Sequence, residues 1–600
     1  MQVVSIDDFI HQSFDFLVIG GGTAGLAVAS RLAQDGNFTV GVLEAGGTAN
    51  GRDDVEIPGY LARSLGTELD WKFKTTPQAR LGGRTVNWPR GKALGGSSAI
   101  NFMTWMRGAR EDYDAWEALG NPGWGWDKLL PYFKKSETFH PPSDSIREKE
   151  DLRYDLEAFG DSGPIHISYA KEYQPSNQLY FKALNSVGVP TNSAHFAGSN
   201  IGAWTNVNNI DPRTMTRSFA TNYCALAGSN LHILTEAIVQ DVVLDKIDDA
   251  YRASGVRFIY KGQEHVVSAS REVILSAGSI KSPQILELSG IGNPEILARA
   301  GIDVKVDSPM VGENLQEHKA IHMVVEVDPE LENRDDLFFD ADRAAAARAQ
   351  YDRDQTGPLA RISSSYSFVP LATFMPQDTL ERLYSQAKDL TGVSSEKKAL
   401  MEQRLKDIDK IGQMEFIFAL GAAPLAVTGK GFGTLFQILQ YPFSVGSIHI
   451  QPTPSEKDDP VIDPRHYDGP HGEIDLEIML ESTRFGRKVL LAPSFNKIVR
   501  QLAYPPASLF TDDEDVKTWI LDSTAVAYHP IGTCAMGGRA GIGGGVVDER
   551  LKVYGVKGLR VVDASIMPLH ISAHIQATVY AIAEKGASMI LEDAAKYSHR

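Results

Sequence analysis

The first fifty residues combine short apolar runs with glycine turns. Residues 15–19, Asp-Phe-Leu-Val-Ile, are mostly apolar and stop at Gly20. Leu, Ala and Val then recur at helical spacing over residues 26–33, and residues 39–43 form a second β-branched run before Glu44. A short continuous apolar run is typical of a buried parallel strand, and spacings of three and four residues are typical of a helix. The pattern predicts a strand–helix–strand unit.

The rest of the chain mixes strand-like and helix-like stretches without a fixed-period repeat. Residues 253–275 alternate on either side of Lys261-Gly262, which predicts a β-hairpin. Charged stretches that carry alanine or leucine predict helices, whereas glycine-, serine- and proline-rich stretches predict loops and turns. We expect helices in 330–355, in 376–412 and from Gln576 toward Ala594, antiparallel strands in 446–468, loops at 81–100 and 541–545, and a surface insertion or lobe boundary at 140–165.

Length and composition limit the classes of protein that this chain can form. It has 600 residues, 43% of them hydrophobic, so we expect two or more lobes with large cores. A net charge of -17 argues against nucleic acid or an anionic membrane as a partner. No run of about 18 apolar residues occurs, so we expect no membrane span. Cys224 and Cys534 are too few for a disulfide framework or a zinc site, and we expect no metal.

The two ends of the chain bear on its location. Residues 1–12 hold two aspartates and no apolar core of ~7–15 residues, which argues against a secretory signal. The C-terminal Ser598-His599-Arg600 resembles a peroxisomal tripeptide but ends in Arg rather than Leu. We expect a cytoplasmic protein with a frayed C-terminal tail, and a peroxisomal location stays open.

The sequence Gly20-x-Gly22-x-x-Gly25 is typical of a turn that binds a dinucleotide. The first glycine permits the tight turn, the second lets the backbone approach a pyrophosphate, and the third lets the helix pack closely on the strand. Glu44 follows Gly25 by 19 residues, where a carboxylate can accept hydrogen bonds from a ribose and would repel the 2′-phosphate of NADP. These residues predict FAD or NAD and leave the choice open; a purely structural turn is the alternative.

Three further stretches resemble signatures of the glucose-methanol-choline (GMC) oxidoreductase family. Residues 91–101, which continue to Gly108 and Asp114, are similar to the first signature, residues 278–292 to the second, and residues 561–568 to the C-terminal block. The resemblance spans nearly the whole chain and implies that the dinucleotide is FAD. It also implies an α/β fold, with a Rossmann-like FAD-binding domain (βαβ, glutathione-reductase type) and a second α+β substrate domain built on an antiparallel sheet.

The family resemblance implies discontinuous domains. We expect residues 1–164, 216–319 and 526–600 to form the FAD-binding domain. Residues 165–215 and 320–525 are then expected to form the substrate-binding domain.

The glycine turn and the family signatures together predict the contacts with FAD. Gly95, Gly96, Ser97 and Ser98 leave backbone N–H groups bare beside two hydroxyls, so their loop can lie against the flavin ring. Some family members attach the flavin through a His just before the Asn of this signature; Ile100 stands there, which implies non-covalent FAD. The predicted cofactor-binding residues are Gly20, Gly22, Thr23, Ala24, Gly25, Glu44, Ala45, Trp71, Arg90, Gly91, Leu94, Gly95, Gly96, Ser97, Ser98, Asn101, Met103, Thr104, Val239, Ala277, Gly278, Asp563, Ala564, His574, Ile575 and Gln576.

The C-terminal part holds the predicted catalytic residues. Residues 528–533 read Tyr-His-Pro-Ile-Gly-Thr, and in the family the His of this stretch, here His529, faces the reactive edge of the flavin. The second partner of the family corresponds to His574, 45 residues on. An imidazole with a pKa near ~6.5 can remove the hydroxyl proton while the alcohol carbon transfers a hydride to flavin N5. We predict His529 as the base and His574 as the group that orients the alcohol.

Three nearby residues leave questions open. His570 either enters the pocket or lies on the surface, and Gln576 matches a position that packs near the flavin pyrimidine. Glu317 stands where Asp is common, with an effect that the sequence does not predict. The loop at 98–105 resembles the fungal alcohol oxidase and formate oxidase branch of the family. His574 stands where the resemblance to formate oxidase implies Arg, which favours a neutral alcohol over formate.

The predicted substrate domain is rich in aromatic residues, which favours a small hydrophobic or aromatic primary alcohol, although we expect most of these residues in the core. Oxygen or another acceptor is expected to reoxidise the flavin. A lyase or cyclase on the same fold, without net redox turnover, is the alternative function, and a flavin-binding protein without turnover is a third. The aromatic residues are Phe338, Phe339, Tyr366, Phe368, Phe374, Phe416, Phe418, Phe432, Phe436, Tyr441 and Phe443.

Overall fold

The N-terminal strand–helix–strand unit forms as the apolar pattern predicts. Strand β1 (Phe14–Ile19) pairs in parallel with β2 (Val40–Leu43), and helix α2 (Thr23–Ala33) connects them. Five of the six β1 residues are buried, and α2 is built largely from Ala, Gly and Ser, so the helix can lie close to the strands. The computed structural model describes residues 3–391, 393–422, 427, 429–453 and 459–597.

Strand β1 lies inside an eight-stranded sheet. On its other side β15 (Gln263–Leu275) runs parallel to it, and β15 pairs antiparallel with β14 (Ala250–Tyr260). Gly262, with φ +78°, lies in the turn between β14 and β15, which confirms the predicted hairpin. The sheet is completed by β12 (Leu231–Leu234), β13 (Ala237–Ile247), β26 (Val556–Lys557) and β27 (Leu559–Val561).

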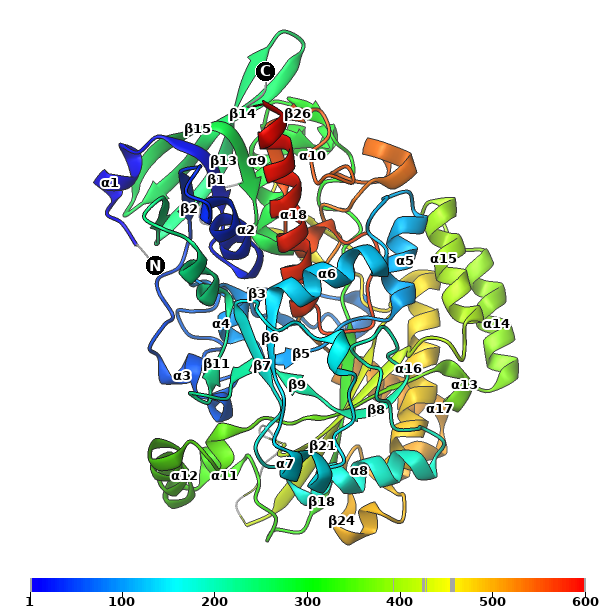
Figure 1. Ribbon diagram of the computed structural model, residues 1–600. Helices are drawn as coiled ribbons and strands as arrows, with labels where there is room; N and C mark the ends of the chain where they lie inside the picture. The colour runs from blue at the N-terminus through cyan, green and yellow to red at the C-terminus, as the bar shows by residue number, and fades with distance from the viewer. Residues whose placement is uncertain (1–2, 392, 423–426, 428, 454–458, 598–600) are drawn as a thin grey trace.

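The C-terminal helix returns to the N-terminal sheet. Helix α18 (Gln576–Tyr597) starts at the predicted residue and packs beside α2 and α6 (Trp126–Ser136) (Figure 1). A guanidinium nitrogen of Arg31 in α2 lies 2.7 Å from the buried carboxylate of Glu584 in α18. The C-terminal helix therefore packs against the helix that directly follows the glycine turn.

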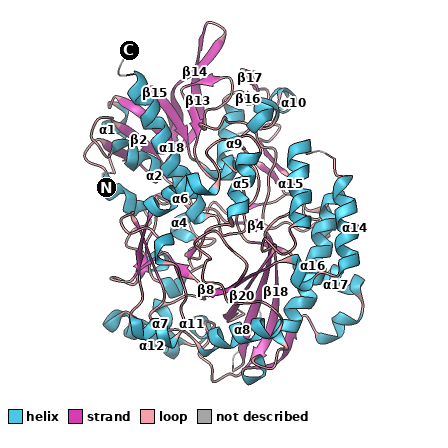
Figure 2. Cartoon of the chain, turned by 45° about the vertical axis from the view of Figure 1, so that its right-hand side comes forward, coloured by secondary structure: helices cyan, strands magenta, loops and turns pink. Residues whose placement is uncertain are grey.

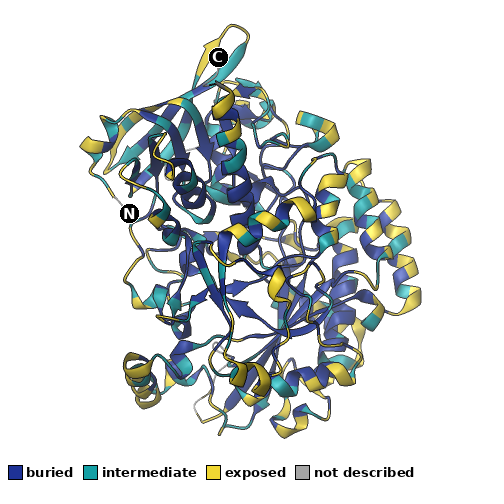
Figure 3. Cartoon of the chain, in the orientation of Figure 1, coloured by how far each residue is buried: buried dark blue, intermediate teal, exposed yellow. Residues whose placement is uncertain are grey.

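A second sheet occupies the other half of the molecule. All of its strand pairs are antiparallel, and its central strands β18 (Lys319–Val327), β21 (Gly431–Leu439) and β20 (Met414–Leu420) are almost wholly buried (Figure 3). Helices cover one side of it (Figure 2). The outer strands are β24 (Val499–Tyr504), β19 (Ser365–Val369), β8 (Gly202–Thr205) and β25 (Ala525–Val526), and the helices are α8 (Pro175–Ser186), α14 (Gln377–Lys388), α16 (Gly469–Leu490) and α17 (Asp513–Ser523).

A small four-stranded sheet lies between the two large ones (Figure 1). It contains β6 (Glu137–His140) and β7 (Ile165–Ser168), which are parallel neighbours, together with β5 (Thr104–Trp105) and β9 (Val207–Asn208). The segment 140–165, where the sequence predicts a surface insertion or a lobe boundary, connects these two paired strands. The two-sheet architecture is confirmed. The domain boundaries remain a prediction, since this sheet takes strands from both sides of residue 165.

Other predicted elements are found, with one exception. The helices predicted in 330–355 and 376–412 form, and the strands predicted in 446–468 form as an antiparallel pair. The prediction of a continuous loop over 81–100 is wrong at two places. Residues 87–88 form a short strand that pairs antiparallel with residues 73–74, and α4 (Ser97–Ile100) makes one helical turn after Gly96. These helices are α11 (Asp336–Phe339), α12 (Ala341–Asp354) and α15 (Ser395–Lys406), and the strands are β22 (Ser447–His449) and β23 (Val461–Asp463).

The remaining elements are short. The glycine-rich segment predicted as a loop at 541–545 overlaps a 3-10 turn, Gly538–Gly543. The C-terminal tripeptide 598–600 lies outside the described residues. No helix in the described part of the chain is long and apolar enough to cross a membrane. The short elements are α1 (Ile6–Ile10), α3 (Asp53–Glu56), α5 (Arg110–Ala118), α7 (Asp144–Lys149), α9 (Gly278–Leu288), α10 (Pro294–Arg299), α13 (Leu371–Phe374), β3 (Phe73–Lys74), β4 (Asn87–Trp88), β10 (Ile210–Asp211), β11 (Thr216–Arg217), β16 (Ile291–Gly292) and β17 (Val306–Asp307).

Candidate active site

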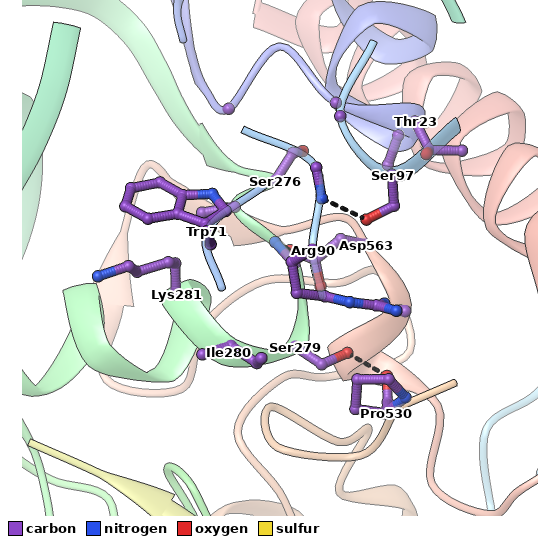
Figure 4. A pocket seen from close by; sticks show the side chains of 18 of the residues that line it. Thr23, Trp71, Arg90, Ser97, Ser276, Ser279, Ile280, Lys281, Pro530 and Asp563 are labelled. Atoms are coloured by element: carbon purple, nitrogen blue, oxygen red, sulfur yellow. Dashed lines mark hydrogen bonds between the residues drawn. The ribbon is translucent and has the colours of Figure 1, made fainter. Parts of the chain in front are cut away.

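A long cavity extends from the carboxyl ends of β1 and β2 to the loop that carries His529. Its lining includes Gly20 and Gly22 at one end and His529 and His574 at the other. Figure 4 shows Arg90 between Ser97 on one side and Lys281 on the other. The cavity is therefore long enough to border both the glycine turn and the predicted catalytic pair.

The three glycines of the turn have different steric roles. Gly20 has φ +95°, and a Cβ there would lie 2.6 Å from the carbonyl oxygen of Ser276. A Cβ on Gly25 would lie 1.8 Å from the carbonyl oxygen of Gly20. A Cβ on Gly22, by contrast, would meet nothing closer than Cα of Gly96, at 3.7 Å. The first and third glycines are required by the packing of the chain on itself, whereas the second leaves open space beside the N-terminus of α2, where an anion is favoured.

Glu44 lies at the end of β2 with its carboxylate in the cavity wall. Its two oxygens accept hydrogen bonds from the backbone N–H groups of Gly21 and Gly46, each at 2.8 Å. Burial raises the pKa of Glu44 to about 7, although these N–H groups act in the opposite direction. Each carboxylate oxygen keeps a second lone pair, so the side chain can still accept a hydrogen bond from a ribose hydroxyl.

The loop of the first signature lies against the glycine turn. The N–H of Gly95 donates to the carbonyl of Gly21 at 2.8 Å, and Ser97 lines the cavity. Ser98 points away from it, because its hydroxyl donates to the carbonyl of Gly95 at 2.6 Å and accepts from the N–H of Ala220. Most predicted cofactor-binding residues line the cavity. Those that do not, and instead lie behind its wall, are Gly25, Leu94, Gly95 and Ser98.

Asp563 connects the two other signatures. Its Oδ2 accepts from the N–H of Gly278 at 2.9 Å and from the hydroxyl of Ser282 at 2.6 Å, while its Oδ1 accepts from Ser565. The carboxyl end of β27 and the start of α9 are thereby held together at the cavity wall. Burial raises the pKa of Asp563, against the effect of these hydrogen bonds.

Several lining residues were not predicted. Three of them belong to the second signature and lie on the first turns of α9: Ser279, Lys281 and Gln284. Their place in the signature could have identified them from the sequence. Nζ of Lys281 lies 4.7 Å from the centre of the Trp71 ring, and burial lowers the pKa of Lys281 to about 8. Phe102, which also lines the cavity, has no such signal in the sequence.

The backbone before His529 is held in an unusual conformation. Tyr528 has φ +64°, which is rare for a bulky residue and is typical of functional sites. The guanidinium of Arg90 donates to the carbonyl of Tyr528, and the N–H of His529 donates to the carboxyl of Glu317 at 2.7 Å. Burial raises the pKa of Glu317 to about 8. The longer side chain of Glu317 thus reaches the backbone of His529, which answers the question that the sequence left open.

The hydrogen bonds around His318 determine the tautomer of His529. Nε2 of His318 lies 3.0 Å from the carbonyl oxygen of Ile571, which can only accept, so this nitrogen carries a proton. Burial holds the pKa of His318 well below its usual value, so the ring is neutral and its Nδ1 is bare. Nδ1 of His529 lies 3.0 Å from that nitrogen and must donate to it. Nε2 of His529 is therefore a free lone pair.

The pKa of His529 itself lies well below its usual value. Burial is the main cause, and the neighbouring His574, His570 and Arg90 act in the same direction. The ring is therefore neutral at pH 7 and able to accept a proton, as a general base requires.

His570 supports His529 from behind. It is fully buried and does not line the cavity. Its Nε2 lies 3.0 Å from the carbonyl oxygen of His529, and its ring stacks on that of His318 with 3.6 Å between centroids. Neither position that the sequence left open, in the pocket or on the surface, is correct, because this side chain forms part of the buried support of the loop.

His574, in the segment before α18, and Gln576, the first residue of that helix, both line the cavity. The ring of His574 lies 4.7 Å from that of His529, centroid to centroid, at 66°. Nε2 of His574 lies 3.0 Å from Oε1 of Glu415, a buried residue of β20. Gln576 accepts from the side-chain amide of Asn101 at 2.6 Å. Glu415 could have been singled out from the sequence, because it is a charged residue within the apolar run 414–420. A buried charge requires a partner, so its position indicated a contact with another polar group.

Few of the aromatic residues of the predicted substrate domain approach the site. The ring of Tyr366 lies 5.9 Å from that of His574, and its hydroxyl bonds to that of Thr104 at 2.7 Å. Phe338 and Phe339 are exposed. None of the aromatic residues considered for the substrate domain lines the described cavity. The apolar side chains that do line it include Ile100, Phe102, Met103, Tyr528 and Ile575.

Comparison with known families identifies the chain. Residues 14–320 and residues 442–583 match the two models of the GMC oxidoreductases. The chain therefore belongs to the GMC oxidoreductase family, as its signatures predict.

Curated relatives align over nearly the whole chain. The chain is 35% identical to the dehydrogenase citC of Monascus ruber, over 99% of this chain and 98% of that protein. It is 32% identical to versicolorin B synthase of Aspergillus parasiticus, over 97% of this chain and 88% of that protein.

Solved structures share the fold. An FAD-dependent oxidoreductase from Chaetomium thermophilum is 32% identical, with a TM-score of 0.87 over 97% of this chain and 100% of that one. A formate oxidase is 30% identical, with a TM-score of 0.85 over 97% and 98% of the two chains. A fungal aryl-alcohol oxidase is 27% identical, with a TM-score of 0.85 over 97% and 99%. The family and these structures show that the cofactor is FAD.

The residues of the cavity fit FAD. The open space at Gly22 and the N-terminus of α2 can hold the pyrophosphate, and Glu44 can hold the ribose. Ile100 lines the cavity where some family members attach the flavin, and its side chain has no atom that could form that bond. Among the described residues, no group of three or more His, Cys, Asp or Glu is arranged to hold a metal ion.

Gly22→Ala tests the open space at the turn. The added methyl group meets no protein atom closer than 3.7 Å, so we expect the polypeptide to fold normally. The methyl group occupies room that the pyrophosphate needs. Steric crowding of this kind costs about 1–3 kcal/mol of binding free energy, which corresponds to a roughly 5- to 150-fold weaker affinity for FAD. Gly47→Ala, where an added Cβ meets nothing within 4 Å, is the control. Titration of each apoprotein with FAD measures the effect, and equal affinities would contradict this assignment.

Proposed function

We propose that the chain oxidises a small hydrophobic or aromatic primary alcohol to an aldehyde, and that oxygen or another acceptor takes the electrons in turn. The observation that supports this most directly is the bare Nε2 of His529, on the wall of the FAD cavity and beside His574. Bound FAD supplies the acceptor for the hydride that leaves the alcohol carbon. The division into an FAD-binding and a substrate-binding domain belongs to the same proposal.

His529 acts as the general base in this scheme. Its Nε2 takes the hydroxyl proton, while its Nδ1–H remains bonded to His318 and keeps the ring from turning. His574 binds the alcohol oxygen and orients the reacting carbon, which reduces the entropic part of the barrier. Arg90 and Glu317 hold the carbonyl and the N–H of the peptide bond between Tyr528 and His529, so the position of the base is fixed before substrate binds.

The cavity walls support a hydrophobic substrate. Ile100, Phe102, Met103 and Ile575 provide apolar surface in the same cavity as the two imidazoles, and the rings of Phe102 and Tyr528 meet edge to face at 6.4 Å. Such walls favour an aliphatic or aromatic group over a sugar, which needs many hydrogen-bonding partners. The similarity to a fungal aryl-alcohol oxidase is consistent with this substrate class.

A lyase or cyclase reaction is the second candidate. One relative is named versicolorin B synthase rather than a dehydrogenase or an oxidase. The same neutral His529 could move a proton in a reaction without net redox change. The two candidates differ in whether the flavin is reduced during turnover.

Anaerobic mixing with a panel of alcohols separates the candidates. We expect hydrophobic and aromatic primary alcohols to bleach the oxidised flavin absorbance and to yield aldehydes. The same mixtures in air, with peroxide detection, show whether oxygen is the acceptor. Product without bleaching would support the lyase or cyclase, and bleaching by sugars alone would contradict the proposed substrate class.

His529→Ala should bind FAD and fold normally but reduce it about 10²–10⁴-fold more slowly, the usual contribution of a general base. Stopped-flow absorbance with a saturating alcohol measures this rate constant. Exposed His11→Ala is the control and should react like the original protein. A rate close to normal in His529→Ala would rule out His529 as the base.

The pH profile of flavin reduction reports the lowered pKa of His529. Protonation of Nε2 inactivates the base, and it occurs only below the pKa, which lies well under its usual value. We therefore expect a constant rate from about pH 6 to pH 8, whereas an imidazole with a pKa near ~6.5 would lose roughly three-quarters of its activity at pH 6. Stopped-flow measurements across this range test it, and a half-maximal rate near pH 6.5 would show that the base is not held in this environment.

A further inference from the structure

Arg217 is a buried cation directly behind the wall of the FAD cavity. It belongs to β11, which lies beside α3 and α4 (Figure 1), and it is only 4% exposed. Its guanidinium donates to the carbonyl oxygens of Val55 and Ser98 at 2.7 and 3.2 Å, and to Oδ1 of Asn101 at 2.7 Å. Arg217 does not line the cavity, whereas Asn101 does. One side chain therefore separates this guanidinium from the cofactor site.

The charge of Arg217 has no anionic partner among the described residues. Burial lowers the pKa of Arg217 to about 9, so the side chain is still a cation at pH 7. The neighbouring Tyr580 is neutral, because burial raises the pKa of its hydroxyl. Arg107, which is also buried, pairs with the carboxylate of Glu137 instead. Carbonyl and amide oxygens carry only partial charges, so the charge of Arg217 remains available to an anion that enters the cavity.

The hydrogen bond from Arg217 also fixes the orientation of the Asn101 amide. Oδ1 of Asn101 accepts from Arg217 and from the N–H of Met103 at 2.9 Å, so the other branch of the amide is the nitrogen. This nitrogen donates to Gln576 at 2.6 Å, and Nε2 of Gln576 donates to Asn209 at 3.0 Å. The second N–H of Asn101 has no partner in the described part of the chain. Asn101 therefore presents a free hydrogen-bond donor in the cavity wall.

We propose, on the basis of the proposed alcohol oxidation and of the predicted place of residues 98–101 beside the flavin, that Arg217 is a positioning residue that favours the reduced state of FAD. A hydride consists of one proton and two electrons, so its transfer adds one negative charge to FAD. In the same step the C–H and O–H bonds of the alcohol break, its C=O bond forms, and its hydroxyl proton goes to His529. The added charge is attracted by the unpaired guanidinium and can accept the free N–H of Asn101.

A purely structural role of Arg217 would have a different consequence. Arg217 ties the loop at 98–101 to Val55, so its loss could also loosen the cavity wall. A looser wall would weaken the binding of oxidised and reduced FAD alike. The potential of bound FAD, relative to that of free FAD, depends only on the ratio of these two affinities. This potential therefore reports the charge of Arg217 separately from its support of the wall.

Arg217→Gln removes the charge and keeps an amide that can donate to Asn101. We expect the equilibrium of bound FAD to shift toward the oxidised state by about 10- to 100-fold, which is a fall of about 30–60 mV for a two-electron couple. The size follows from the attraction between two charges several ångströms apart at an effective dielectric constant of ~20. Reductive titration with xanthine, xanthine oxidase and a reference dye measures the potential without any alcohol. An unchanged potential in Arg217→Gln would overturn the proposal.

Two further variants separate the charge from other effects of the substitution. Arg217→Lys keeps the charge and should retain most of the potential, even where it binds FAD more weakly. Arg252→Gln is the matched control, because Arg252 also donates to a backbone carbonyl, that of Ser270 at 2.9 Å, and does not line the cavity. It should leave the potential unchanged. Equal falls in Arg217→Gln and Arg217→Lys, or in Arg217→Gln and Arg252→Gln, would show that the charge of Arg217 is not the cause.

The original protein provides a test that needs no variant. Its bound FAD should have a higher potential than free FAD, because the unpaired cation stabilises the reduced state. A potential below that of free FAD would overturn the proposal even if Arg217→Gln failed to fold. Flavin that no alcohol reduces would instead contradict the proposed function, and the titrations, which contain no alcohol, would still decide the role of Arg217.

Discussion

The reacting end of the site depends on the hydrogen bond between Nδ1 of His529 and Nδ1 of His318. His318 directly precedes β18, and His529 follows β25 by three residues. These two strands pair antiparallel with Lys319 opposite Val526, and the N–H of Ala527 donates to the carbonyl of His318 at 3.0 Å. The register of this short pair therefore brings the two imidazoles together. A slip of one residue would turn their side chains to opposite faces of the sheet.

The donor and the acceptor of that hydrogen bond cannot exchange, because the neighbouring groups fix where the protons of both rings lie. The carbonyl of Ile571 requires a proton on Nε2 of His318, and burial excludes a second proton from that ring. His570 stacks on His318 and binds the carbonyl of His529. Backbone carbonyls, which cannot change their protonation, thus set the proton positions of a chain of neutral rings. The free lone pair on Nε2 of His529 thus results from groups that do not line the cavity themselves.

The cofactor end of the site is largely local in sequence, and this is why its pattern could be predicted. Gly20, Gly22, Gly25 and Glu44 lie within one strand–helix–strand unit, where spacing alone brings them together. The partners of the two imidazoles that are predicted to be catalytic lie far away in sequence: 211 residues separate His318 from His529, and 159 separate Glu415 from His574. Periodicity predicts that residues 414–420 form a buried strand, but it does not predict what the carboxylate of that strand will contact.

His529 and His574 show how identical side chains acquire different roles in one cavity. The outer nitrogen of His529 is bare because a neutral imidazole, His318, lies behind it, whereas His574 has a carboxylate behind it. Proteins that share this fold carry the names of dehydrogenases, oxidases and a synthase, so the fold alone does not select the reaction.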